Sequence, residues 1–314
     1  MTRSVRLLPL AAATTLITLL AGCQNGASVA TADAGAEKIN AYISCFNGVE
    51  APIHESYQQY TSWIADAEAG PTGKEKQVRA PGTVLSHRVE MCGAPMTAAL
   101  AMTPANPLLD PVARTYQERF AALDERIADA VRYYDREDYL RDGAEGMKQR
   151  HAPLMQAYAA FFEAGEAMDA ALEQNEDSRR QEQIAAIEKE EGQSAAYFHL
   201  KIIGDAKQLV KVLNADAPDL AAGRAQLARY QSTLEQAQQA KVGQGDAMWG
   251  HMERSADKLA SAAGRRIERL QENTPLTRSE QMLMQSGSLP PAGSRPALLD
   301  SYNDLVDMSN RMTR

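Results

Sequence analysis

Apolar residues recur at three- and four-residue steps along most of the chain, which is the spacing of one face of an α-helix. The first clear stripe consists of Ile39, Tyr42, Phe46, Val49, Ile53, Tyr57, Tyr60 and Ile64. Pro52 lies inside this stripe, and because its ring would press on the preceding turn, we expect a kink or break at residues 47–52. The turn sequence Gly70-Pro71-Thr72-Gly73 ends the segment.

The same spacing predicts further helices, whose ends are marked by Gly, Pro or capping residues. The expected segments are 85–102, interrupted by Gly93 and Pro95; 110–134, with Asp110 as N-cap; 153–172; 178–213, opened by a capping box at 178–181; 218–243; 248–275; and 298–312, after a loop at 287–296. No convincing period-two run of β-branched residues accompanies them. We therefore predict an all-α fold, an elongated bundle of about six to eight long, mostly antiparallel helices.

The first 23 residues predict export and a lipid anchor rather than a part of the fold. Arg3 and Arg6 precede an apolar stretch at 7–21, which is too short to span a bilayer comfortably. The stretch ends in Leu20-Ala21-Gly22-Cys23, which resembles a bacterial lipobox and predicts cleavage before Cys23 and acylation of that residue. The alternative is an ordinary secretory signal that happens to place a cysteine at its end.

These features predict an order of segments. Residues 1–22 are expected to be the signal peptide, 23–36 the lipidated cysteine and a flexible tether of small and polar residues, and 37–314 a single all-helical periplasmic domain. Gln24 follows the cysteine, where Asp commonly signals retention in the inner membrane, so Gln favours the outer membrane. We expect a cell-envelope protein that is lipid-anchored in the outer membrane and faces the periplasm.

Charge and cysteine content narrow the picture further. The formal net charge of −8 and the pI near 5.3 argue against a nucleic-acid surface, which usually needs a basic face. Once Cys23 is lipidated, Cys45 and Cys92 are the remaining cysteines of an exported chain. A Cys45–Cys92 disulfide is the natural inference, and two buried free thiols are the alternative.

Several strings of residues together resemble the YiiG-like family of bacterial lipoproteins, whose shared domain has no known function. They are KINAYISCFN at 38–47, YQQYTSWI at 57–64, GPTGKE at 70–75, YYDREDY at 133–139 and SYNDLVDMSN at 301–310. These strings bracket nearly all of the chain that follows the lipobox. The resemblance implies an exported, mostly helical domain, and it brings no established catalytic residues.

The sequence carries little that points to catalysis or metal binding. The sequence has no HExxH, GxSxG, P-loop, GxGxxG or CxxC motif. The pairs Glu50/His54 and His87/Glu90 are spaced to share a helix face, but two ligands do not make a metal site, because a structural zinc needs about four. We therefore predict no metal and no cofactor.

The densest aromatic cluster is the best candidate for an interaction surface. Tyr57, Tyr60 and Trp63 are followed closely by Gly70, Pro71, Thr72, Gly73, Lys74 and Glu75. Amphipathic aromatic residues favour surfaces that bind a sugar, a peptide or a partner helix. The alternative is that Tyr57 and Tyr60 continue the core stripe and that Gly-Pro-Thr-Gly is only a turn.

The expected function follows from the anchor, the helical periodicity and the lack of a catalytic constellation. We expect a non-enzymatic envelope lipoprotein that serves as a structural or protein-interaction module, bound to the membrane through its anchor and to a possible envelope protein partner. The alternative is a ligand-binding or hydrolytic lipoprotein that acts on cell-wall fragments. A deep pocket with convergent buried acids would favour this alternative.

Overall fold

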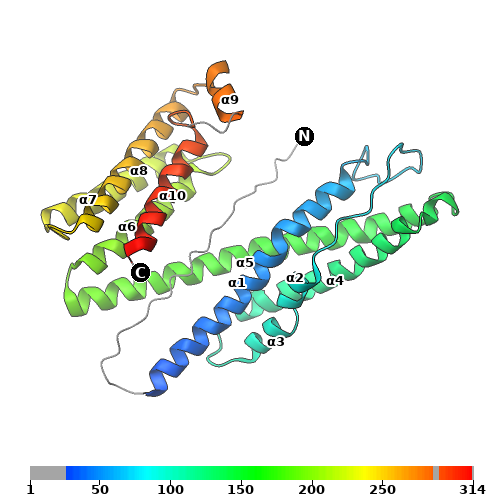
Figure 1. Ribbon diagram of the computed structural model, residues 1–314, viewed down its shortest axis with the longest axis horizontal. Coiled ribbons are helices and arrows are strands. Elements are labelled where there is room, and N and C mark those ends of the chain that lie inside the picture. The colour runs from blue at the N-terminus through cyan, green and yellow to red at the C-terminus, as the bar shows by residue number, and fades with distance from the viewer. Residues whose placement is uncertain (1–25, 286–289, 313–314) are drawn as a thin grey trace. The chain divides into compact units, whose positions relative to one another are not determined.

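The protein is all-helical, as the spacing of its apolar residues predicts. The computed structural model describes residues 26–285 and 290–312, and the lipobox with Cys23 lies outside this range. The described residues form helices and connecting segments without a strand (Figure 1): α1 (Gly26–Thr61), α2 (Ser86–Met91), α3 (Ala94–Ala101), α4 (Asp110–Asp135), the 3₁₀ turn η1 (Asp138–Leu140), α5 (Glu145–Glu191), α6 (Ala195–Leu213), α7 (Leu220–Gln239), α8 (Ala247–Gln271), α9 (Arg278–Gln285) and α10 (Arg295–Met312). Within the described ranges, no helix is both long and apolar enough to cross a membrane.

The contacts divide the described chain into two compact units, whereas the sequence predicts a single domain over 37–314. Unit 1 comprises residues 26–176 and unit 2 comprises residues from 177 onward, so the boundary falls within α5. Each unit has its own apolar core, one built mainly by α1, α4 and the first part of α5, the other by α6, α7, α8 and α10. The units also differ in charge: residues 26–176 hold 13 Lys and Arg against 23 Asp and Glu, whereas residues 177–314 hold 18 of each kind.

Helix α1 corrects two expectations. It begins at Gly26, so residues 26–36 are helical and do not form the expected flexible tether. Five of these eleven residues are Ala, the residue with the highest helix propensity. The helix also continues through Pro52 without a break, and the neighbouring Val49 and Ile53 are fully buried. Their packing offsets the roughly 3 kcal/mol that a proline costs inside a helix.

Helix α5 also differs from the expected pattern. The sequence predicts helices that begin near Pro153 and at the capping box of residues 178–181, but both positions lie inside one helix that begins at Glu145. This helix ends before Gly192, whose φ of +68° favours glycine. Ser194 then caps α6 by accepting a hydrogen bond from the Tyr197 amide. The helix boundary therefore lies at Gly192–Ser194, about fourteen residues after the predicted one.

A lysine inside unit 1 is fully buried. Lys38 of α1 is 1% exposed, and its Nζ donates hydrogen bonds to Asp110 Oδ2 at 2.7 Å and to the carbonyl of Met102 at 3.0 Å. The Tyr42 hydroxyl donates to Asp110 Oδ1 at 2.8 Å. The Asp110 carboxylate thus holds α1 against the α3–α4 connection. Asp110 is the first residue of α4, and Leu109 takes the N-cap position that the sequence predicts for Asp110.

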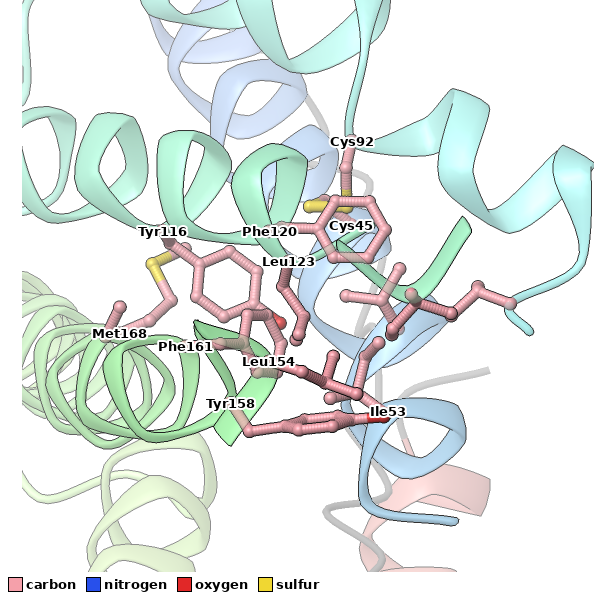
Figure 2. Packing of buried hydrophobic residues seen from close by; sticks show 14 of the residues in the cluster. Cys45, Ile53, Cys92, Tyr116, Phe120, Leu123, Leu154, Tyr158, Phe161 and Met168 are labelled. Carbon is pink, nitrogen blue, oxygen red and sulfur yellow. A yellow bond between two sulfur atoms is a disulfide. The ribbon is translucent and has the colours of Figure 1, made fainter. Parts of the chain in front are cut away.

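The Cys45–Cys92 disulfide is present and joins α1 to the residue that follows α2. The two Cα atoms are 4.7 Å apart, within the range that a disulfide requires. Gly48 lies close to the residue before Cys92, since a Cβ there would lie 2.6 Å from Met91 Cε, the end of a flexible side chain. Figure 2 shows the bridge beside Phe120 of α4, close to the aromatic core formed by Tyr116, Tyr158 and Phe161.

Candidate functional site

The connection between α1 and α2, residues 62–85, is a long segment without helix or strand, which we call the strap. Ser56 and Gln59 of α1 hold it against that helix, and Trp63 at its start joins it to its later part. Trp63 Nε1 donates to the carbonyl of Arg79 at 2.9 Å, Gln59 Nε2 to that of Ala80 at 2.9 Å, and Ser56 Oγ to that of Gly82 at 2.5 Å. The strap therefore runs back along the helix from which it emerges (Figure 1).

His151 of α5 fixes the first half of the strap. Its buried ring lies between the Tyr60 hydroxyl, 3.0 Å from Nδ1, and the Ala67 carbonyl, 3.0 Å from Nε2. Because a carbonyl only accepts, this arrangement places the ring hydrogen on Nε2, and Nδ1 accepts from Tyr60. Gly70 packs on the same ring with a φ of +86°, and a Cβ there would lie 2.6 Å from His151 Cδ2. The buried Gly70 can therefore be only glycine.

The turn that follows is closed by one carboxylate. Glu75 accepts hydrogen bonds from the Thr72 amide at 2.6 Å, the Thr72 hydroxyl at 2.8 Å and the Gly73 amide at 2.8 Å. Burial raises the pKa of Glu75, but these hydrogen bonds outweigh it and hold the pKa below its ordinary value. Gly73, with a φ of +82°, approaches Ala144 so closely that a Cβ would lie 2.5 Å from the alanine Cβ. The strap thus also rests on the α4–α5 connection.

The aromatic residues of the predicted interaction surface mostly belong to the core. Tyr60 is fully buried and cannot contribute to a surface, so the core alternative holds for it. Tyr57 is half-buried and packs edge-on against Tyr158 and Phe162, with ring centroids 5.4 and 5.5 Å away. Trp63 is half-buried beside Tyr60. Pro71 is buried as well, and of the predicted residues Thr72, Gly73 and Lys74 are exposed.

The exposed side of the strap carries cations that the sequence analysis did not include beyond Lys74. Lys76 and Arg79 are also exposed, and none of the ion pairs found in the described parts of the chain involves these three side chains. The signal was present in the sequence as the run KEKQVR at 74–79. This run of charged residues indicates a binding surface only together with the structure, in which buried groups on the opposite side hold the strap backbone in place.

The Glu50/His54 pair lies elsewhere in unit 1 and serves packing. The carboxylate is 3.5 Å from His54 Nε2 and accepts a hydrogen bond from the Tyr116 hydroxyl at 3.0 Å. Burial and the negative charge of Glu50 raise the pKa of Tyr116. The His54 ring stacks on Phe162 at 4.5 Å, and Gly165 leaves room for the carboxylate. Over the described residues, no three His, Cys, Asp or Glu side chains form a group that could hold a metal ion.

A hollow in unit 2 lies beside the α7–α8 connection. It is lined by Lys241, Gly243, Asp246, Trp249 and Glu253, among others. Its two carboxylates have structural partners: Asp246 caps α8 by accepting from the Met248 amide at 2.8 Å, and Glu253 accepts from Trp249 Nε1 at 2.9 Å. Trp249 is 2% exposed, because Gly243 crosses its ring. These acids are therefore not the convergent buried pair that cell-wall hydrolysis would use.

The packing at Gly70 makes a testable prediction. Gly70→Ala should lower the free energy of unfolding of unit 1 by at least about 2 kcal/mol, because the positive φ is strained and His151 must move away from Tyr60 and Ala67. Amide hydrogen exchange over residues 66–80 should speed up. Gly143→Ala is the matched control: Gly143 also has a positive φ, of +67°, but nothing lies within 4 Å of its added Cβ. Equal effects of the two substitutions would contradict the role of the His151 contact.

Comparison with known proteins places these features in a family. The profile of the family "Protein of unknown function (DUF3829)" matches residues 33–311. The chain is also 28% identical over 278 residues to "Uncharacterized protein YiiG" of Escherichia coli (strain K12), covering 88% of this chain and 78% of that protein. No solved structure matches. The YiiG-like resemblance of the sequence is thus confirmed, and the chain belongs to the DUF3829 family of proteins of unknown function.

Proposed function

We propose that this protein is a lipid-anchored protein of the cell envelope, acting in the periplasm as a non-enzymatic structural or protein-interaction module, and that the exposed side of the strap is its contact surface. The N-terminal residues up to Cys23 support the anchor, because a basic segment, a short apolar stretch and a lipobox-like end occur in order. Several acyl chains hold a protein stably on a membrane that its polypeptide does not span.

The main support for the proposed contact surface is that an exposed, irregular segment is held firmly in place. The strap has 24 residues and is held by Ser56, Gln59, Tyr60 and His151. Loops of this length are uncommon in compact domains unless they are functional, and binding residues are often presented on loops that a rigid scaffold positions. A surface that is already ordered loses little conformational entropy when a partner binds.

The anchor makes a direct prediction. Cys23→Ser should abolish incorporation of labelled fatty acid and move the protein from the membrane fraction to the soluble periplasmic fraction. Cys45→Ser with Cys92→Ser is the matched control, since it removes two cysteines but leaves the lipobox intact. Continued acyl labelling of the Cys23→Ser protein would overturn the anchor.

The contact surface is tested by photo-crosslinking in cells. A photoreactive residue at position 74 or 77 of the strap should give adducts, whereas the same residue at position 119 or 125 of α4 should give few, although all four positions are exposed. Adducts are scored as covalent attachment to any envelope component, protein or polymer. Equal yields from the strap and from α4 would refute the strap as the contact surface.

A further inference from the structure

We propose that the strap binds the cell-wall polymer, through attraction between its lysine and arginine side chains and the free carboxylates of the wall peptides. This inference rests on the proposed function and names the partner of the same contact surface. It makes the protein a structural link between the membrane and the wall, and it excludes a membrane surface as the strap's target.

The charge of the strap is the first step of the argument. Lys74, Lys76 and Arg79 place three exposed cations within six residues. Glu75 is the only acidic residue between Glu68 and Glu90. Its carboxylate closes the turn through Thr72 and Gly73, so it is oriented toward the strap's own backbone. The strap also carries the exposed Asp66 and Glu68 near its start, so its positive outward-facing charge lies in the part from residue 69 onward, at Lys74, Lys76 and Arg79.

The surroundings of the strap make this charge distinctive. Unit 1 holds 23 acidic and 13 basic residues, and three of its 13 cations lie together at residues 74–79 of the strap, where Glu75 is the one acid. A polyanion is repelled by the excess of acidic residues in unit 1 and attracted to the cluster at residues 74–79, which gives the contact a defined position. Lysine ammonium groups on flexible stems suit a polymer whose carboxylates are not held in one fixed geometry.

The position of the strap along α1 favours the wall over the anchoring membrane. Only two residues separate Cys23 from the start of α1 at Gly26, and α1 has 36 residues, which corresponds to a helix of about 54 Å. The strap follows the other end of this helix (Figure 1). For the strap to reach the headgroups next to the anchor, α1 would have to lie flat, which would bring the acidic surface of unit 1 against anionic lipids.

The test is co-sedimentation of the mature-length chain carrying Cys23→Ser with purified, insoluble cell-wall sacculi. The chain should pellet with the sacculi, and about 0.5 M salt should release it. The variant Lys74→Gln/Lys76→Gln/Arg79→Gln should bind at least about tenfold more weakly. The control variant Arg114→Gln/Arg119→Gln/Arg126→Gln removes three exposed cations from α4 of the same unit and should bind within about twofold of the parent.

Two further binding measurements test the proposal without the variants. Sacculi whose carboxylates have been amidated should no longer retain the parent chain, and vesicles of anionic phospholipid should not bind it. Four results would overturn the proposal. The strap variant could bind sacculi as strongly as the parent, or both triple variants could lose binding equally. Amidated sacculi could still retain the parent chain, or the vesicles could bind it in a strap-dependent way. If sacculi fail to bind while photo-crosslinks at positions 74 and 77 persist, the wall is not the partner but the contact surface stands. Loss of those crosslinks would refute the proposed function itself.

Discussion

Lys38→Met is expected to lower the free energy of unfolding of unit 1 by about 3–5 kcal/mol, the cost of leaving one partner of a buried ion pair alone. The side chains of Lys38 and Asp110 are 2% and 16% exposed, so water cannot replace the missing ammonium group fully. The carbonyls of Met102 and Pro104 would lose their donor as well. Because methionine fills much of the lysine volume, the loss should come from electrostatics and hydrogen bonding and not from a cavity.

Urea unfolding followed by Trp63 fluorescence measures this effect. The chain has two tryptophans, one in each unit, so a Trp249→Phe background isolates the signal of unit 1. Lys148→Met is the matched control, since Lys148 pairs with Glu145 at 2.9 Å but both side chains are about half exposed. Its removal should cost less than about 1 kcal/mol. Similar losses of unfolding free energy in the two variants would mean that the buried Lys38–Asp110 pair stabilises unit 1 no more than an exposed ion pair does.

The same pair predicts how stability depends on pH. Burial raises the pKa of Asp110, but the hydrogen bonds from Lys38, Asn106 and Tyr42 outweigh it and hold the pKa below its ordinary value. The stabilising contribution is therefore fully present above the unfolded pKa of about 4, and it is lost as the pH falls through the lower folded value. Between pH 7 and pH 3, the parent should lose more stability than Asp110→Asn. Parallel curves would contradict the assignment.

Replacing both Cys45 and Cys92 by Ala is expected to lower the free energy of unfolding of unit 1 by about 4 kcal/mol. The bridge closes a loop of 47 residues, and in the chain-entropy account a loop of that size stabilises the fold by this amount. This loop contains the second half of α1, the whole strap and α2. Its loss should therefore also raise hydrogen exchange in α2, a helix of six residues without a buried side chain.

Two comparisons separate the bridge from the packing of its sulfur atoms. The parent protein measured in reductant should match the double alanine variant to within about 1 kcal/mol, because both lack the cross-link and differ only in two small buried groups. The variant Cys45→Ala should behave like the double variant, since Cys92 alone cannot form the bridge. A double variant that unfolds at the same urea concentration as the parent would show that the disulfide does not stabilise unit 1.

Much of the fold could be predicted from the sequence because helices are encoded locally. The spacing of apolar residues identified the core faces of α1, α4, α6 and α8, and Gly93 with Pro95 marked the break between α2 and α3. The Cys45–Cys92 pairing was predictable by counting, because these two cysteines remain once the predicted lipid attachment at Cys23 is set aside. The strap was predictable only as a turn at residues 70–73.

The tertiary structure decided what the local pattern leaves open. Proline is unfavourable inside an isolated helix, yet α1 and α5 continue through Pro52 and Pro153 because the residues around them are buried against other helices. A lysine normally predicts an exposed position, but Lys38 is buried because Asp110, 72 residues later, meets it. Tyr60 and Trp63 share one aromatic cluster in the sequence, and contacts with Tyr134 and His151, far along the chain, decide that Tyr60 belongs to the core.

The sequence by itself therefore determined the helical class, several helix ends such as those of α4, and the disulfide, since these depend on periodicity, on Gly and Pro, and on the number of cysteines. The tertiary structure alone decided the burial of Lys38, the path of the strap along α1 and the division into two units. Each of these depends on contacts between residues that lie far apart in the chain, and such contacts leave no periodic signal in a single sequence.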